Sequence, residues 1–356
     1  QDPRKARGSA RLAFGAADDM QTQYAAAMFL ADSFTAEGRL LNAQLWLRQA
    51  SQAAPDDMSY TFARERFGYA HSRSPWVFRF NFEIQPTNNV NGGSQAQYFR
   101  NPGIPWLPPE IPIAGEQQAL SGTITQLTAL APYRLPPTAT TRTEFTLAGY
   151  QQLTYLSAEA KQLAPEADAS FFNFSTIVAG VSRQYKPLNG DVIYGAGLYL
   201  GHNWQGGFDQ GNTMRLEGSF DALLSNTTHG LGFVSAEHQA RFDAPIRSSD
   251  TYSIAMGLAR QFANADILQG YVGHRDTQSQ SPGITNQAYN IRFLWNKAEP
   301  VAGMDLSATA VAEYRNYPYS PYDPQNGRQD VRLAATMVLE LDNFEYMGFA
   351  PTLNLS

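Results

Sequence analysis

The sequence contains no cysteine, little charge and no long apolar run, and each of these absences narrows the class of protein. The lack of cysteine is compatible with an oxidising compartment. Only 16% of the 356 residues are charged, against roughly 25% in typical soluble domains. No stretch of about 18 consecutive apolar residues occurs, so the length needed to cross the hydrocarbon excludes a helical membrane span.

Positive charge is also scarce. The net charge is −6 and the pI is near 5.4, whereas binding to a phosphate backbone requires clustered lysine and arginine, so nucleic acid is not an expected partner. The mean hydropathy of −0.37 is typical of soluble chains, but the polar inward residues of a transmembrane barrel lower its average in the same way. Residues 1–11 are polar and basic, so no signal peptide opens the chain. We expect that its start was removed or that it is a fragment.

The first 74 residues have a helical pattern that the remainder lacks. Apolar residues recur at helical spacing over 24–34 and 40–50, and a third helix is predicted over about 57–70. The offsets of one tetratricopeptide repeat are matched by Phe34, Gly38, Ala43, Ala50 and Pro55. In such a repeat, small residues let the paired helices approach closely and the proline ends the second helix. A generic alanine-rich helical hairpin is the alternative. Both interpretations predict a small α-helical domain over residues 1–74.

From residue 75 onward, apolar and polar residues alternate in the pattern of β-strands. In the segment 76–85 every second residue is apolar and most of the others are polar. Successive side chains of a strand point to opposite sides, so lipid on one side and a water-filled lumen on the other produce this pattern. Similar alternation recurs at about 122–131, 143–152, 171–183, 192–201, 214–221, 231–242, 252–262, 267–275, 289–296, 304–314, 331–341 and 347–355.

These segments predict a mainly β fold, a transmembrane antiparallel β-barrel over residues 75–356. About 13 strands are present, with the length that a tilted strand needs to cross a bilayer. Because single-chain barrels of this kind have an even strand number, we expect about 14 in total, with a C-terminal truncation after Ser356 and an open seam beside the first strand. Tyr252 and Phe262 bracket one strand and predict an aromatic girdle, because their separation matches the apolar band of such barrels, about 25 Å tall. A soluble β-sandwich is the alternative, but its strands are usually shorter.

The connections alternate between long and short. Long polar or proline-rich links span 86–120, 153–168, 203–213, 276–287 and 316–329, and short ones lie between them. Outer-membrane barrels have short periplasmic turns and longer extracellular loops. With the helical part in the periplasm, the first strand runs outward and every long loop lies outside.

Three short motifs accompany the predicted strands. They are Pro86-Thr87-Asn88-Asn89-Val90-Asn91-Gly92 after the first strand, Arg328-Gln329-Asp330 before a late strand, and Gly348-Phe349-Ala350-Pro351-Thr352-Leu353 before the last. In this order, and after a helical repeat, they resemble the surface lipoprotein assembly modifiers. Members of that family join a periplasmic tetratricopeptide domain to an outer-membrane barrel of about 14 strands, and they deliver lipoproteins or soluble binding proteins to the cell surface. The resemblance implies the same architecture and role here, although only one repeat is evident.

The sequence has no recognisable catalytic or cofactor-binding constellation. Its five histidines are scattered, without the paired spacing of a zinc site. Gly195-Ala196-Gly197 lies within a predicted strand and does not precede a helix, so it is not a phosphate-binding loop. We therefore expect no enzymatic activity, no cofactor and no metal.

Charged residues of both signs fall at predicted lumen-facing positions. Across neighbouring strands they are expected either to form ladders of ion pairs that stiffen the barrel or to contact a passing client. The candidate lumen contacts are Arg79, Glu83, Glu144, Arg215, Glu217, Asp221, Arg292, Arg332 and Glu340.

The first long connection contains a second candidate site. Tyr98, Phe99 and Trp106 lie there among many prolines. Because an exposed aromatic cluster usually marks a contact surface, these residues are candidates for client binding. The loop either folds into the lumen as a plug, stands outside, or packs on the barrel wall.

These patterns predict an outer-membrane translocon component with its helical part in the periplasm. Its expected partners are a client lipoprotein or secreted protein and outer-membrane lipid, and the barrel is expected to be monomeric. A passive pore for small solutes and a polysaccharide export barrel are the alternatives. An export pore for a charged polymer should have a lumen of one sign, which the mixed charges disfavour.

Overall fold

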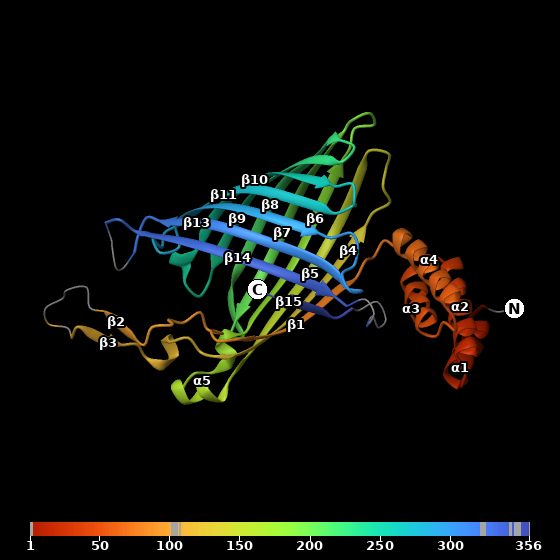
Figure 1. The fold of residues 1–356 in the computed structure, drawn as a ribbon, viewed down its shortest axis with the longest axis horizontal. Coiled ribbons are helices and arrows are strands. Elements are labelled where there is room, and N and C mark those ends of the chain that lie inside the picture. Colours follow the sequence, from red (N-terminus) through yellow and green to blue (C-terminus); the bar gives the residue numbers. More distant parts are fainter. Residues whose placement is uncertain are drawn as a thin grey trace.

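The computed structural model describes residues 3–100, 106, 108–320, 325–341, 344 and 350–355. Within them, a bundle of helices precedes a large curled antiparallel sheet (Figure 1). The mainly β fold class expected from the alternating segments is therefore confirmed.

Four helices form the N-terminal part: α1 Pro3–Ala16, α2 Met20–Ala36, α3 Leu40–Gln52 and α4 Asp57–Arg73. Aspartates begin two of them, because Asp19 accepts from the Thr22 amide and Asp56 from the Ser59 amide, each at 2.7 Å. The expected helices correspond to α2, α3 and α4, whereas α1 was not predicted. Among the described residues, no helix is both long and apolar enough to cross a membrane.

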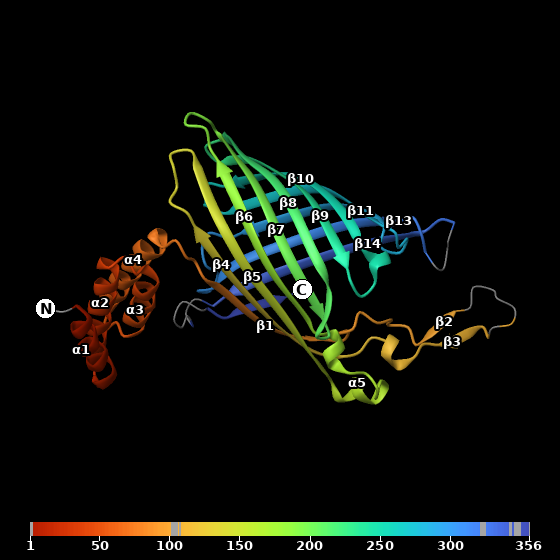
Figure 2. The same ribbon diagram turned by 180° about the vertical axis from the view of Figure 1, so that it is seen from behind.

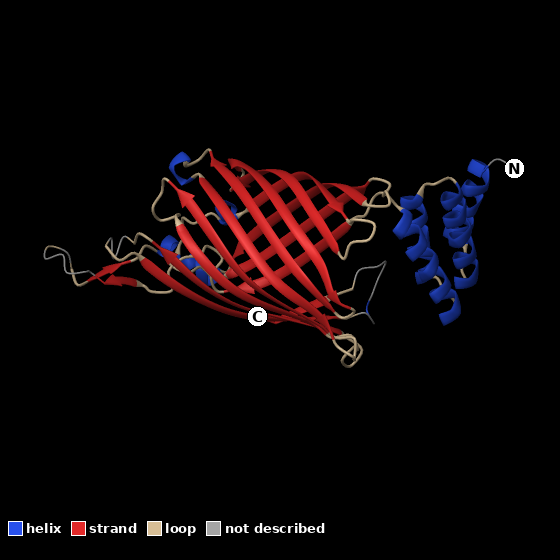
Figure 3. Ribbon diagram, turned by 90° about the horizontal axis from the view of Figure 1, so that it is seen from above, coloured by secondary structure: helices blue, strands red, loops and turns tan. Residues whose placement is uncertain are grey.

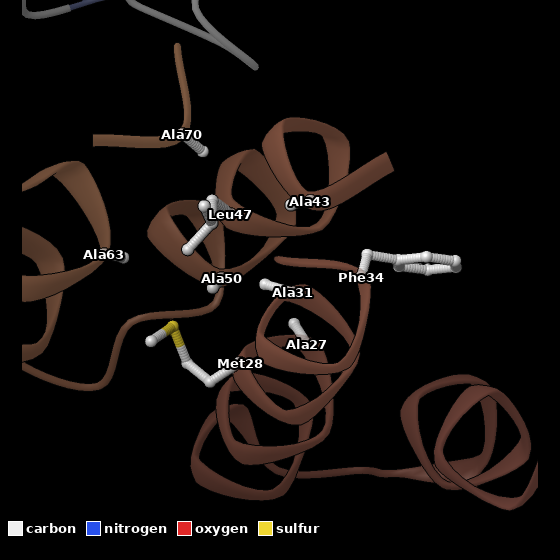
Figure 4. Packing of buried hydrophobic residues seen from close by; sticks show 9 residues of the cluster. All are labelled: Ala27, Met28, Ala31, Phe34, Ala43, Leu47, Ala50, Ala63 and Ala70. Atoms are coloured by element: carbon white, nitrogen blue, oxygen red, sulfur yellow. The ribbon is translucent and has the colours of Figure 1, made fainter. Parts of the chain in front are cut away.

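Small residues fill the contact between α2 and α3. Ala27 and Ala31 of α2 face Ala43 and Ala50 of α3, and all four are fully buried (Figure 4). Leu47 completes this core. Alanine brings the helix axes close and loses little side-chain entropy on folding, which explains the offsets noted in the sequence.

In the described part of the chain the main sheet has thirteen antiparallel strands, and every one overlaps a predicted segment. Neighbours along the sheet are neighbours along the chain, apart from the small hairpin inserted between β1 and β4. The strands are β1 Arg79–Thr87, β4 Gly122–Arg134, β5 Thr141–Leu156, β6 Phe174–Tyr185, β7 Val192–Gln205, β8 Phe208–Ser225, β9 Thr228–Arg241, β10 Ser249–Gln261, β11 Ile267–Ser279, β12 Asn286–Asn296, β13 Asp305–Tyr317, β14 Arg328–Glu340 and β15 Thr352–Leu355.

The sheet curls round until its first and last strands, β1 and β15, lie on the same side of the barrel (Figures 1 and 2). Among the described residues no ladder joins these two strands, and β15 pairs only with Met337–Glu340 of β14. The seam expected beside the first strand is therefore present in the described part of the chain.

The two ends of the barrel differ. The helical bundle lies beyond the end that carries the short turns (Figures 1 and 3). The opposite end carries α5 Ala158–Leu163, the 3₁₀ helices η1 Gly115–Gln117, η2 Ala169–Phe172 and η3 Pro245–Arg247, and a hairpin of β2 Tyr98–Arg100 and β3 Glu110–Pro112. The elaborated connections thus share one end, as the alternation of link lengths predicted.

The prediction of one long link is wrong. Residues 203–213 were expected to form a loop, but β7 and β8 continue through them and meet at Gly206–Gly207. Both glycines have positive φ, +60° and +85°, a conformation that a two-residue hairpin turn requires and that glycine adopts without strain. The ends of β7 and β8 that meet at this turn are mostly polar on both faces, so they lack the alternation that predicts a strand.

Candidate functional site

The strands present two different faces, and β10 shows the difference most clearly. Tyr252, Ile254, Met256 and Leu258 point to one side, and each is 44–56% exposed. The small residues between them, over 253–259, are half-buried on the other side. An apolar row that is more exposed than the row of small residues is the reverse of a water-soluble sandwich, whose apolar face is buried.

The row of small residues lies on the concave face of the sheet. Arg275 of β11 reaches Glu313 of β13 at 3.7 Å, across the intervening strand β12. On the inside of a curved sheet, side chains two strands apart converge, whereas on the outside they splay apart. We call this side the inner face and the opposite, apolar side the outer face.

The strand register places all the predicted lumen contacts on the inner face. For example, Glu217 pairs with Gly197 and Ser235, and Arg332 lies directly opposite Glu313. The complete set is Arg79 and Glu83 on β1, Glu144 on β5, Arg215, Glu217 and Asp221 on β8, Arg292 on β12, and Arg332 and Glu340 on β14.

Part of this set forms ion pairs along the wall. Arg215 lies 2.8 Å from Glu217 on its own strand and 3.8 Å from Glu237 on β9. Arg134 lies 3.3 Å from Glu144 across the β4–β5 pair. These groups are partly exposed, so each pair contributes at most about 1 kcal/mol to stability.

A second cluster lies on β11 and β13. Glu313 accepts from Arg315 at 2.5 Å and also contacts Arg275, while Arg315 donates to the Tyr317 hydroxyl at 3.0 Å. The predicted set of lumen contacts does not include Glu237 or Arg275. The alternation of β9 and β11 in the sequence could have identified both, because each stands between outer-face residues.

Asp221 has a histidine partner that the sequence pattern did not indicate. His229 lies on β9 with its Nδ1 2.7 Å from Asp221 Oδ1. Other histidines pair on the outer face, His238 with Asp250 at 2.7 Å and His202 with Asn212 at 2.7 Å. Among the described residues, no group of three or more histidine or acidic side chains is placed to hold a metal.

The motif after the first strand has a structural function. Asn91 Oδ1 accepts from the Leu120 amide at 3.0 Å, and its Nδ2 donates to the Gln118 carbonyl at 2.8 Å. Asn89 closes a tight turn through the Gly93 amide and carbonyl, at 2.8 and 2.9 Å. Asn91 therefore fastens the beginning of the first connection to its end, and Asn89 fixes the local turn beside it.

Apolar packing holds this base to the barrel rim. Val90 and Leu120 pack against Leu156 of β5 and against Ala160 and Ala164 around α5, in one buried cluster. Asn173 adds a polar contact, because its Oδ1 accepts from the Thr154 amide at 2.8 Å. The base is thus rigidly placed at the rim opposite the helical bundle.

The aromatic candidates lie beyond this base. Tyr98 and Phe99 belong to the β2–β3 hairpin, which extends away from the barrel (Figures 1 and 3). Tyr98 is 52% exposed and Trp106 is 82% exposed, whereas Phe99 is half-buried. The described part of the loop therefore stands outside the barrel, which disfavours the plug and the wall-packing alternatives.

The helical bundle is fastened to the short-turn end through the linker that follows α4. The Val77 amide donates to the Pro132 carbonyl at 3.1 Å, and the Arg134 amide donates to the Pro75 carbonyl at 2.7 Å. Ser74 and Val77 are each 2% exposed. The linker therefore continues the edge of the sheet and is not a free tether.

His71, near the end of α4, lies close to the same junction. Its Nδ1 lies 3.1 Å from Gln44 Oε1 and its ring stacks on Phe67. Burial lowers the pKa of His71 below its ordinary value, and the positive charges of Arg134, Arg48 and Arg79 lower it further. Because two of these arginines belong to β4 and β1, the end of α4 lies close to the barrel.

Comparisons with known proteins give distant structural likenesses only. No protein-family model matches the chain, and no curated protein matches it significantly. An outer membrane channel from Pseudomonas putida F1 is 11% identical, with a TM-score of 0.42 over 74% of this chain and 94% of that one. The KdgM porin is 14% identical, with a TM-score of 0.30 over 61% and 91%. The beta domain of the Bordetella autotransporter BrkA is 13% identical, with a TM-score of 0.34 over 74% and 96%. At these values the likenesses carry no argument about function.

Proposed function

We propose that the chain is an outer-membrane barrel protein that delivers a protein client to the cell surface, with its helical bundle in the periplasm. The apolar outer face and the polar inner face suit lipid outside and water inside. The strands of the main sheet are mostly 11–18 residues long, so they reach or exceed the about 9–11 residues that cross a bilayer.

The linker between α4 and β1 is the observation that carries this proposal. Since Pro75 and Val77 pair with the end of β4, a client bound to the helices is held at the short-turn mouth. Short turns face the periplasm in outer-membrane barrels, which is the side from which an exported client arrives. The exposed Tyr98 and Trp106 at the far end supply a contact surface where the client emerges.

Deletion of the gene tests this proposal. Surface-exposed client, measured by protease shaving of whole cells, is expected to disappear while the periplasmic pool persists. A matched strain in which residues 1–73 alone are deleted should keep the barrel but lose delivery. Unchanged surface display in both strains would contradict the translocon role.

A passive pore for small solutes is the second candidate, and the inner face favours it. Inner positions of β7 and β10 carry small residues, among them Gly195, Gly197, Ala255 and Gly257. A pore predicts steady single-channel conductance in planar bilayers, with or without residues 1–73. A translocon that opens only with its client predicts no steady conductance.

A further inference from the structure

A hollow of about 300 Å³ lies in the inner face near the short-turn mouth. Its volume is at the lower end of the range of small-molecule pockets, which are lined mainly by apolar and aromatic groups with a few polar ones. Two adjacent register rows form its wall. They run through Ile193, Asp221, Leu231, Gly257 and Tyr271, and through Gly195, Ser219, Phe233 and Ala255.

The hollow exists because its floor is made of small residues. Gly195, Ser219 and Ala255 lie in one row with Phe233. A Cβ atom added to Gly195 would lie 2.3 Å from the Ser219 hydroxyl. The Ser219 side chain therefore leaves no space for a larger residue at Gly195. The hollow keeps its depth between the rings of Phe233 and Tyr271.

Tyr271 provides a fixed aromatic wall. Its ring occupies the space beside Gly257, where an added Cβ would lie 2.6 Å from the ring. Its hydroxyl donates to Gln269 Oε1 at 2.9 Å. One side of the Tyr271 ring thus covers the backbone at Gly257. The hydrogen bond to Gln269 holds the ring in this position without a ligand.

The polar groups of the hollow are suited to hydroxyl groups. Ser219 and Gln184 supply a hydroxyl and a side-chain amide, which both donate and accept. Asp221 supplies a carboxylate, of which Oδ1 lies 2.7 Å from His229 Nδ1 while Oδ2 is left to accept from a ligand hydroxyl.

We propose that this hollow binds one ring of a neutral polyhydroxylated ligand, of the hexose class. Such a ring has an apolar C–H surface that packs against Tyr271 and Phe233, and its hydroxyls exchange hydrogen bonds with Asp221, Gln184 and Ser219. Aromatic walls combined with a few placed polar groups provide affinity and orientation together. The inference goes beyond the proposed function, because ligand binding in micelles does not depend on client delivery.

Saturation-transfer NMR with the full chain in detergent micelles tests the inference, with methyl β-glucopyranoside as the probe. The wild-type chain is expected to show saturable transfer. Ala255→Leu fills the floor and should abolish it, and Tyr271→Ala should weaken it by about tenfold or more. Ala334→Leu, at an inner position of β14 away from the hollow, should retain it.

Three outcomes would overturn the inference. They are no saturable transfer with the wild-type chain, undiminished transfer in Ala255→Leu, and preferential binding of tetramethylammonium that depends on Asp221. Should Ala255→Leu fail to fold, Tyr271→Ala and Asp221→Asn decide, because neither adds volume to the wall. Unchanged surface display in the deletion strains, together with saturable probe binding by the wild-type chain, would refute the translocon role and leave the hollow assigned.

Discussion

Asn91 binds the backbone of Leu120 from across the first connection: its Oδ1 accepts from the Leu120 amide at 3.0 Å, and Val90, next to it, donates its own amide to the Leu120 carbonyl at 2.8 Å. These bonds close a connection of about 30 residues at its base. Closing a loop of that length costs conformational entropy, and side-chain bonds to backbone offset part of this cost. The asparagine motif thus has a structural reason that applies whatever the loop binds.

We predict that Asn91→Ala loosens the first connection without unfolding the barrel. The Leu120 amide and the Gln118 carbonyl lose a partner, and an unsatisfied buried polar group costs about 1–3 kcal/mol. Limited proteolysis should cut between residues 92 and 119 faster than in the wild-type chain. Asn88→Ala is the matched control, because Asn88 is exposed and belongs to the same motif, and equal cleavage of the two variants would contradict the prediction.

Gly180→Ala should destabilise the barrel. A Cβ at this inner position would lie 2.2 Å from the Tyr199 ring, which lies under the Arg215 guanidinium. Overpacking of this kind typically costs about 1–3 kcal/mol, so the urea midpoint of the folded barrel should fall. Gly149→Ala, where an added Cβ meets nothing within 4 Å, should leave the midpoint unchanged, and a similar loss at both sites would refute the role of Tyr199.

The helical bundle should lose stability in mild acid. The folded state lowers the pKa of His71 below 6.5, so the unfolded chain binds the proton more tightly. The free energy of unfolding therefore has its full value above pH 6.5 and decreases as pH falls toward the folded pKa. Helical circular dichroism during thermal unfolding should show a lower midpoint at pH 5.5 than at pH 7.5.

His71→Gln should abolish that pH dependence, since glutamine does not titrate. His238→Gln, on the outer face of β9, should preserve it. Identical pH dependence of the helical midpoint in wild type and His71→Gln would contradict the linkage.

The absence of cysteine permits a direct test of orientation. Asn226→Cys lies in the β8–β9 turn and Ser281→Cys in the connection after β11. With the bundle in the periplasm, a membrane-impermeant maleimide added to intact cells should label Ser281→Cys and should label Asn226→Cys only after the outer membrane is permeabilised. The reverse pattern would place the helices outside.

The sequence was sufficient to place the strands, because two different environments impose a period of two on each of them. Their lengths were less predictable. β8 begins at Phe208 and continues through Asp209, Gln210 and Asn212, which are polar on both faces, so alternation gives no signal there. Beyond the apolar band, backbone hydrogen bonds between neighbouring strands extend the strand ends. These bonds do not depend on the side chains, so the sequence contains no pattern that reveals them.

Other elements were missed for different reasons. Helix α1 is rich in polar residues and glycine, and it was not recognised because its apolar face is short. The β2–β3 hairpin has three residues in each strand, too few for any period. The pairing of Asp221 with His229 depends on the β8–β9 register, in which an irregularity at 223–225 shifts the partners.

Solvent accessibility of two adjacent residues on β10 tests the central claim most directly. Ser253 faces inward and Ile254 outward, so single-cysteine variants Ser253→Cys and Ile254→Cys should differ in proteoliposomes of the full chain. We predict that a water-soluble thiol reagent labels Ser253→Cys and does not label Ile254→Cys, whereas a brominated lipid tail quenches a fluorophore at Ile254 only. Equal labelling of both positions, or labelling of Ile254→Cys alone, would contradict a barrel with lipid outside and water inside.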